Sequence, residues 1–434
     1  MANAALVDSA AARRNWWPFA GLLVAAGLLQ LALFGYVAAP GLAGTGDSRY
    51  YLHAAQTLRD TGHLLNPDGT PYRYWPPLYP VLLWAVGSPT GVWVLHGLCL
   101  LGSLWLWSWL SRQLLPARRA LTVPVLLALS TPWLLVSKFV WAESVFLLLF
   151  AAYAGALWHW LRTGRWAWWA VVTAIGVLLP LQRTLGLFLL AGVGVVLLVG
   201  AWKRPVAVRR WPLLLHLAVS VVGGMGWQWY ALLVAGPNRY HPSRGWGQLL
   251  SSAADYGFVL SRWLLPLPST SRSLLPHALW AAVLVGLFVL LWPRRQVAQQ
   301  EAPATPATLV TPAFCPELAR RLLLRALWSA TLALVALVAA LTVFAQSAAG
   351  IHDAERYASV LCGPVVLLVL AAWPARGPRW LGPALLAIWV LGAAVRVGHV
   401  ALDLRRVVPL TSASAPASGP GPGPHGQQVG AAGE

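Results

Sequence analysis

The chain has 434 residues, enough by length for about two or three soluble domains, but only 10% of them are charged and 58% are hydrophobic. Soluble proteins carry roughly a quarter charged residues, and so much apolar surface cannot be hidden in one core, so a water-soluble fold is excluded. The formal net charge of +19 is not gathered in a compact basic domain, which argues against a nucleic-acid partner and indicates basic loops beside a membrane. The three widely spaced cysteines predict neither a disulfide framework nor a cysteine-based zinc site.

Apolar runs of spanning length recur along the chain, and about eleven are expected at roughly 20 residues per crossing. Backbone groups in hydrocarbon must bond within their own segment, so we predict an all-α, polytopic membrane protein whose membrane-embedded domain covers residues 1–402. The first run has features of a cleavable signal peptide, but its length favours an uncleaved anchor. The predicted spans cover approximately residues 17–39, 91–111, 120–136, 143–161, 167–182, 184–201, 211–234, 276–293, 326–345, 358–374 and 380–402.

Basic residues in the short loops favour a cytoplasmic N-terminus. That orientation places the first long loop, residues 41–90, and the loops at 235–275 and 346–357 outside. Residues 294–325 then form a flexible cytoplasmic linker, and the Gly, Pro, Ser and Ala-rich residues 411–434 form a disordered tail. We expect a multi-pass protein of a cell membrane, by residue usage a bacterial cytoplasmic membrane, with its active site on the outer face.

The first outer loop has features of a folded element. Asp47 and Ser48 are suited to cap a short helix that Gly62 ends, and apolar residues at helical spacing give it a face that suits the membrane surface. A turn is expected at residues 66–69, after which Pro76-Pro77 stops regular structure. The chain then returns to the bilayer beside Asp47.

The segments GDSRYYL (46–52) and PPLYP (76–80) resemble membrane-embedded glycosyltransferases of the GT-C superfamily, specifically protein O-mannosyltransferases and the aminoarabinose transferases of lipid A. The resemblance implies a GT-C fold of about eleven transmembrane helices with a helical first outer loop, in which Asp47 is the catalytic base. It also implies that Tyr51, Pro77 and Tyr79 bind substrate. The mannosyltransferases have two adjacent acids where this chain has Asp47 alone, which favours the bacterial-type group. From spacing alone, helix capping explains Asp47 equally well.

Two further residues match the family in the next outer turns. Glu143 opens the fourth span, where an acid is costly unless it is solvated or partnered. The resemblance implies a catalytic role for it, holding a metal or orienting a phosphate, and a favourable contact with the helix dipole is the alternative. Arg183 interrupts apolar sequence between two spans, and the resemblance implies that it binds the donor phosphate or Glu143. A snorkelling arginine is the alternative there.

The segment IHDAERYASVLCGP before a late span matches an Arg-Tyr feature of the same transferases. The resemblance implies that Arg356 and the neighbouring Tyr357 bind the donor phosphate. A guanidinium suits this role because it forms paired hydrogen bonds to phosphate oxygens. Some relatives bind a divalent metal ion, for which Glu143 and His352 are the candidate ligands. A solvated loop of mixed charge explains the same residues, and no other cofactor is expected.

Together these assignments predict an enzyme that transfers a hexosyl or pentosyl group from a polyprenyl-phosphate sugar donor, with inversion. The acceptor is a lipid, a glycan or a protein, and membrane lipid surrounds the site. No GxGxxG or GxxxxGKS loop is present, in agreement with a donor that carries no nucleotide. The alternatives are a secondary transporter or lipid flippase, which predicts ionisable groups in mid-span and repeated halves, and a non-catalytic scaffold. Arg396 is the main mid-span charge.

Overall fold

The computed structural model describes residues 16–73, 75–203, 210–234, 247–265, 274–292, 316–344, 351–373 and 380–410. Within these residues the regular elements are helices, accompanied by two isolated β-bridges. The predicted all-α fold is therefore confirmed. The predicted disordered tail at 411–434 lies outside the described residues.

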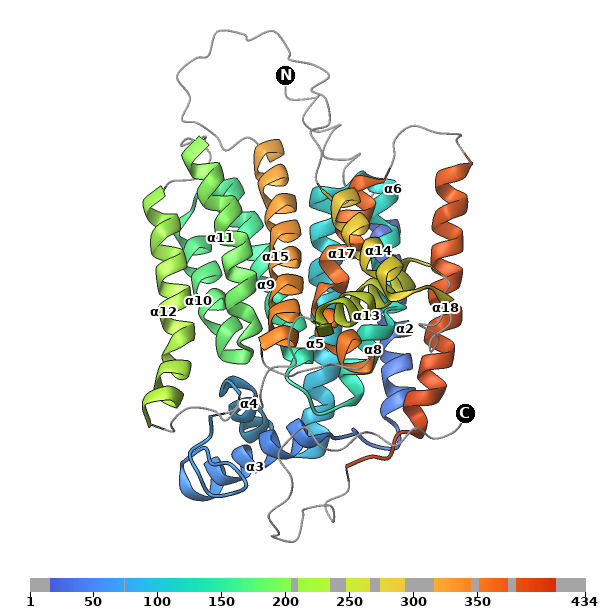
Figure 1. Cartoon of the computed structure of the whole chain (residues 1–434). Coiled ribbons are helices and arrows are strands. Elements are labelled where there is room, and N and C mark those ends of the chain that lie inside the picture. The colour runs from blue at the N-terminus through green and yellow to red at the C-terminus, as the bar shows by residue number, and fades with distance from the viewer. Residues whose placement is uncertain are drawn as a thin grey trace.

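Nine helical segments in the described part of the chain are long and apolar enough to cross a membrane. These nine segments coincide with nine of the eleven predicted spans. The shorter apolar helices α10 and α14 coincide with the other two. The long helices stand side by side as one bundle (Figure 1). The elements are α2 (Trp16–Ala38), α5 (Pro89–Leu114), the broken run α6 (Ala117–Ala120), α7 (Thr122–Ala128) and α8 (Thr131–Lys138), α9 (Glu143–Thr163), α10 (Trp166–Gln182), α11 (Leu185–Lys203), α12 (Arg210–Val234), α14 (His277–Leu290), α15 (Pro316–Phe344), α17 (Cys362–Ala372) and α18 (Leu381–Arg406).

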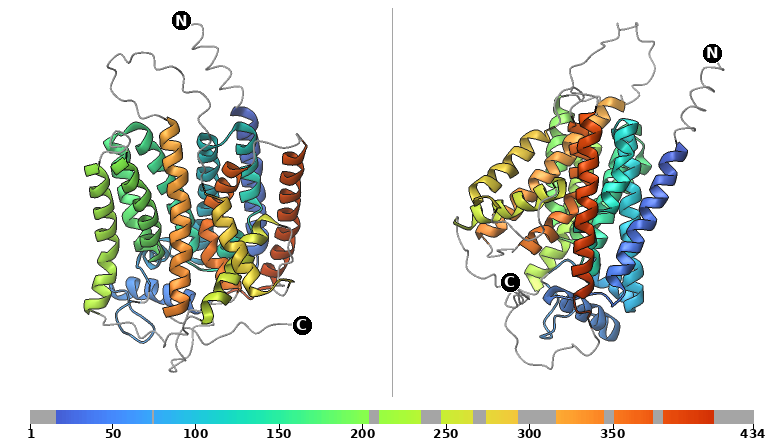
Figure 2. Two further views of the ribbon diagram at one scale, coloured as in Figure 1. Left: turned by 45° about the horizontal axis from the view of Figure 1, so that its top comes forward. Right: turned by 90° about the vertical axis from the view of Figure 1, so that its right-hand side faces the viewer.

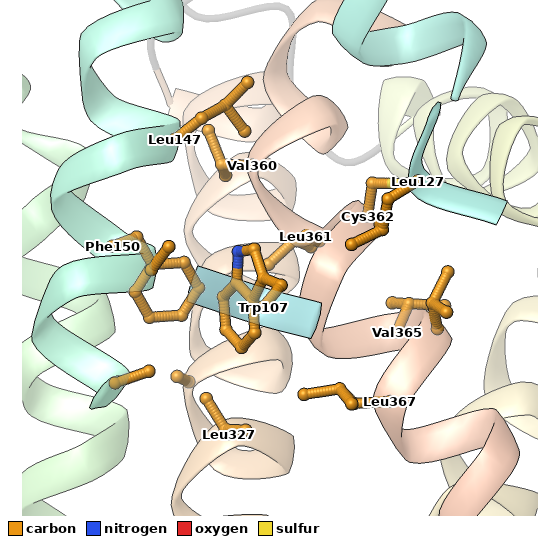
Figure 3. Close-up of a cluster of buried hydrophobic side chains, with 14 of the residues drawn as sticks. Trp107, Leu127, Leu147, Phe150, Leu327, Val360, Leu361, Cys362, Val365 and Leu367 are labelled. Atoms are coloured by element: carbon orange, nitrogen blue, oxygen red, sulfur yellow. The ribbon is translucent and has the colours of Figure 1, made fainter. Parts of the chain in front are cut away.

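The core of the bundle is apolar and closely packed around Trp107 of α5 (Figure 3). The Trp107 ring meets that of Phe150 at 5.6 Å between centroids, and Gly363 of α17 lies against the indole, where a Cβ would come within 2.6 Å of Nε1. Large apolar side chains on the outside, such as Leu391 and Val395 of α18, remain exposed. That outward face suits contact with lipid tails, which are as apolar as the core.

Two spans are broken, and their breaks meet. One contains the α7–α8 junction, where the Ser130 hydroxyl accepts a hydrogen bond from the Trp133 backbone N–H at 3.4 Å. The other is α16 (Ile351–Ala358), followed by a 3₁₀ turn, η2 (Ser359–Leu361), and α17. Trp133 Nε1 donates to the Ser359 carbonyl at 3.2 Å, which joins the two breaks. Irregular backbone inside a membrane protein is tolerated where protein groups satisfy it in this way.

The first long loop folds into two helices, α3 (Gly46–Thr61) and α4 (Leu78–Val86), which lie together at one end of the bundle (Figure 1). The expected helix and its end at Gly62, with φ of 74°, are confirmed. The cap differs from the prediction, because Thr45 is the N-cap and exchanges hydrogen bonds with Ser48 in a capping box, which leaves Asp47 free for other contacts. The turn at 66–69 is present, closed by Gly69 N–H to the Asn66 carbonyl at 2.9 Å.

The segment before α3 is tied to the bundle by backbone bonds. Ala43 forms a parallel bridge with Phe139, and the buried Lys138 ammonium donates to the carbonyls of Val37 and Gly41 at 3.1 and 2.8 Å. Leu410, beyond α18, donates its N–H to the carbonyl of residue 42 at 2.9 Å. These bonds fix where α3 begins.

Three segments differ from the sequence interpretation. Residues 351–357, predicted as part of an outer loop, lie in the helix α16. Residues 247–264, predicted as part of an outer loop, form the helix α13 (Gly247–Leu264), which runs across the long helices (Figure 1) and packs against α14 on one side of the bundle (Figure 2). Residues 316–325, predicted as linker, are the first turns of α15. Glu317 pairs there with Arg320 and Arg321 at helical spacing, which stabilises a helix despite the polar composition.

Candidate active site

Four charged residues from four separate segments meet beside α3. Asp47 is in the first turn of α3, Glu143 is the first residue of α9, Arg183 lies between α10 and α11, and Arg356 is on α16. All four were singled out in the sequence, Glu143 and Arg183 as isolated charges at span ends and Asp47 and Arg356 from the family resemblance of their loops. The structure brings them into one cluster, including the expected approach of Arg183 to Glu143.

Arg356 lies at the centre of the cluster. Its Nη2 is 2.7 Å from Oδ2 of Asp47, and its Nε donates a hydrogen bond to Oε1 of Glu143. Arg183 Nη1 pairs with the same Glu143 oxygen. Two acids therefore face two guanidinium groups, so these four side chains balance in charge.

The cluster is buried unevenly. The side chain of Glu143 is 1% exposed and that of Arg356 5%, whereas those of Arg183 and Asp47 are 12% and 17% exposed. Solvent or a substrate therefore reaches the cluster from the Asp47 and Arg183 side. Although burial opposes the charge of Arg183, the carboxylate of Glu143 raises the pKa of that guanidinium above its usual value.

Trp141 links Arg356 to the start of α3, and it was not predicted from the sequence. The Arg356 guanidinium lies 4.0 Å from the centroid of its ring, a cation–π contact. Trp141 Nε1 donates at 2.9 Å to the hydroxyl of Thr45, the residue that caps the helix of Asp47. Phe139 stacks on the same indole with centroids 4.3 Å apart. The ring thus fixes Arg356 relative to the start of α3.

Neighbouring contacts hold the remaining members in place. Gln182 Nε2 donates to the carbonyl of Ala142 at 2.9 Å, which ties the residue before Arg183 to the residue before Glu143. The ring of Tyr357 lies 5.5 Å from the Arg183 guanidinium and 5.6 Å from that of Arg356. Tyr357, predicted as a phosphate-binding residue, therefore borders both arginines.

The residues predicted to bind substrate from the first loop form an aromatic layer behind Asp47. The ring of Tyr51 meets those of Tyr79 and Trp75 edge-on at 5.1 and 5.5 Å. Tyr79 is buried, and its hydroxyl is 2.9 Å from Nε2 of His96, so it supports Tyr51 from the protein interior. Pro77 is half-buried and precedes the first residue of α4. Of these residues, Tyr51 is the nearest to the charged cluster.

Tyr51 is held in its neutral form. Burial raises its pKa far above the ordinary value for tyrosine, and the neighbouring carboxylates of Asp47 and Glu143 raise the pKa further against the opposing effect of Arg183. The Tyr51 hydroxyl is therefore protonated at any working pH. It can donate a hydrogen bond but cannot accept a proton as a base.

The described residues do not form a metal-binding group. No set of three or more His, Cys, Asp or Glu side chains gathers within the described ranges. Glu143 is already paired with two guanidinium groups, which bring the positive charge that a divalent ion would supply. His352 is the second residue of α16, but its side chain lies outside the described part of the structure. The donor set in view does not fit a divalent ion at Glu143.

Fold and cluster together define a polytopic, all-α membrane protein with a buried charged cluster beside its first-loop helices. The chain is similar in structure to ArnT from Cupriavidus metallidurans bound to undecaprenyl phosphate, with a TM-score of 0.53, 14% identity, and coverage of 90% of this chain and 76% of that one. The apo structure of the same ArnT aligns at a TM-score of 0.42 with 14% identity, over 83% of this chain and 78% of that chain. At this identity the likeness shows the fold. No protein-family model and no curated protein matches the sequence.

Proposed function

We propose that the chain is a glycosyltransferase that moves a sugar from a polyprenyl-phosphate-linked donor to an acceptor hydroxyl. The observation that carries the proposal is the meeting of two arginines and two acids beside α3, where an anionic head group and a nucleophile can be handled together. The fold supports the donor class, because the similar ArnT structure contains undecaprenyl phosphate. The residues of the GDSRYYL and PPLYP segments that carry the family resemblance lie in α3 and α4, around this cluster.

Arg356 and Arg183 are the phosphate-binding groups in this proposal. A guanidinium forms paired, charge-assisted hydrogen bonds to phosphate oxygens, and in a buried site such bonds are stronger than in water. Glu143 holds both arginines, and the Nη2 atom of Arg356 faces Asp47, the more exposed acid of the cluster. Stabilising the charge that grows on the departing phosphate is the step at which such preorganised donors act most strongly.

Asp47 is the general base. It is the more exposed of the two carboxylates, and the neighbouring Tyr51 hydroxyl stays protonated. An arriving phosphate competes with Asp47 for Arg356, which frees the carboxylate to accept a proton from the acceptor hydroxyl.

The reaction balances without a further reactant. The acceptor oxygen forms a bond to the anomeric carbon, the bond from that carbon to the phosphate oxygen breaks, and Asp47 takes the acceptor proton. Polyprenyl phosphate leaves with the bonding electrons. A single displacement with attack opposite the leaving group inverts the configuration, as proposed from the sequence.

No step is assigned to a metal ion, because Glu143 is committed to Arg356 and Arg183. We propose an outer-face site in a bacterial cytoplasmic membrane, on the distribution of basic loops. The transferred group is a hexosyl or pentosyl unit, and the acceptor is a lipid, a glycan or a protein.

The test is turnover of a panel of polyprenyl-phosphate sugars by the full chain in lipid nanodiscs. Wild type is expected to release free polyprenyl phosphate, with or without chelator. Asp47→Asn should lose about 10²–10⁴-fold in rate, the usual contribution of a general base. Asp60→Asn, on the same helix but exposed and bonded only to Gln56, is the control. Asp47→Asn turnover equal to that of the control would remove the base assignment, and no turnover of any donor would favour a transporter or flippase.

A further inference from the structure

A second buried pair of opposite charges lies on another side of α16. Glu355, the residue next to Arg356, pairs with Arg262 of α13. Both are buried, at 6% and 4% exposure, and the hydroxyl of Thr131 in α8 is 3.4 Å from the other Glu355 oxygen. Adjacent residues on a helix point in directions about 100° apart. One short helix therefore carries an arginine toward the candidate active site and an acid toward α13.

The described residues around this pair leave little room for a second ligand. The cavity beside it, lined by Ser130, Thr131, Cys362 and Arg396 among others, has a volume of about 30 Å³, which is room for roughly one water molecule. A buried ion pair is also weak evidence for stability, because desolvation offsets the attraction. Charged groups in membrane proteins are costly and are usually retained for a role. The pair can instead fix the position of α16 relative to α13.

The last turn of α13 is held from two directions. Arg262 pairs with Glu355 of α16, while two residues of α18 bond to the backbone that follows. Trp389 Nε1 donates to the carbonyl of Trp263 at 2.7 Å, and Arg396 donates to the carbonyl of Leu265. Both carbonyls belong to a helix C-terminus, where a cation is favourable. Arg396, the mid-span charge that the proposed chemistry does not use, is accounted for in this way.

The helix α16 needs such support. It has eight residues before the 3₁₀ turn η2 interrupts the regular helix, so the rotation of α16 is not fixed by α17 alone. Its C-terminal end is fixed by the Ser359 hydroxyl, which donates to the Arg356 carbonyl at 2.6 Å, and by Trp133, which donates to the Ser359 carbonyl. The pair between Glu355 and Arg262 fixes its rotation about its own axis. A rotation of α16 would move the Arg356 guanidinium away from Asp47 and Glu143.

We infer that Arg262 is a positioning residue for Arg356, acting through Glu355 and anchored by α18. The inference rests on the proposed function, in which Arg356 binds the donor phosphate. It assigns a task to α13 and connects that helix to the phosphate-binding arginine.

A double-mutant cycle tests the inference. Arg262→Met, Glu355→Gln and the double variant are prepared in nanodiscs, and binding of undecaprenyl phosphate is measured. Each single change should weaken binding about tenfold, and the double variant should also lose about tenfold rather than about a hundredfold, because the two residues act through one contact. Arg262→Lys, which keeps the charge, should recover most of the affinity. The control is Glu317→Gln, which removes ion pairs at the start of α15 and should bind as wild type.

Hydrogen exchange of residues 351–358 provides a readout that does not depend on the ligand. Arg262→Met should speed exchange there and leave α9 unchanged. Wild-type affinity in both single variants would overturn the inference, as would faster exchange throughout the bundle or independent tenfold losses that multiply in the double variant. If wild type does not bind undecaprenyl phosphate but Arg262→Met still loosens 351–358 alone, the positioning of α16 stands and the proposed donor fails.

Discussion

Trp141 allows the sharpest quantitative prediction, because two of its interactions can be removed separately. Trp141→Phe keeps an aromatic face under Arg356 but loses the 2.9 Å hydrogen bond to Thr45. Trp141→Leu loses both. A neutral hydrogen bond contributes about 1 kcal/mol, and a cation–π contact at a desolvated site contributes about 2 kcal/mol.

Because 1.4 kcal/mol corresponds to a tenfold change in affinity, these losses set upper limits for undecaprenyl phosphate binding of about fivefold for Trp141→Phe and about 150-fold for Trp141→Leu. They are upper limits because the empty site loses part of the same interactions. The Leu variant should also lower the rate of sugar transfer more than the Phe variant does, since Arg356 then loses its closest aromatic contact.

The assay is binding of undecaprenyl phosphate to the full chain in nanodiscs, followed by donor turnover. The controls are Trp105→Phe and Trp105→Leu, at an exposed position on α5, which should bind as wild type. Equal affinities for Trp141→Phe and Trp141→Leu would refute the cation–π argument. Wild-type affinity in both would show that Trp141 does not position Arg356.

Three further changes have distinct expected outcomes. Asp47→Asn should bind undecaprenyl phosphate as well as or more tightly than wild type while losing transfer, because its carboxylate competes for Arg356; weaker binding in an equilibrium titration would contradict this. Glu143→Gln leaves two buried guanidinium groups without their shared carboxylate and should lower the free energy of unfolding by about 3–5 kcal/mol, with Glu143→Asp less affected, as thermal unfolding would show. Gly363→Ala should destabilise the core by about 1–3 kcal/mol, because the added Cβ meets Trp107, whereas Gly398→Ala, with open space around it, should melt as wild type; equal melting temperatures would show that the core adjusts freely.

The bundle could be predicted because it depends on composition, whereas the roles of the four charged residues came from the family resemblance. Apolar runs of spanning length give the helices directly. An ionisable residue in such a sequence is conspicuous, and the cost of burying it implies a partner, which marks Glu143 and Arg183. Asp47 and Arg356 stand in more polar loops and were identified from the resemblance of the segments around them. The partner of each charged residue could not be predicted, because it depends on tertiary structure. Arg356, for example, is 309 residues from Asp47 in the chain.

Other features carried no comparable signal. Trp141 is one of 27 tryptophans in the chain, and tryptophans are common membrane anchors. Its contact with Arg356 could therefore not be predicted from the sequence. The helix α13 was predicted as loop because its polar residues lower the mean hydropathy, although Asp255 and Arg262 are buried in the bundle. The start of α15 was assigned to a linker for the same reason. Polar composition and exposure to solvent are not equivalent where ion pairs form.

The bond between Leu410 and the carbonyl of residue 42 makes the sidedness of the protein accessible to experiment. The chain leaves α18 beside the segment that leads into α3, so whatever follows Leu410 starts on the same side of the membrane as Asp47. A reporter that is active on only one side, fused after Glu434, would therefore identify the compartment into which the charged cluster opens. Leu410 therefore lies on the side of the membrane on which the charged cluster lies.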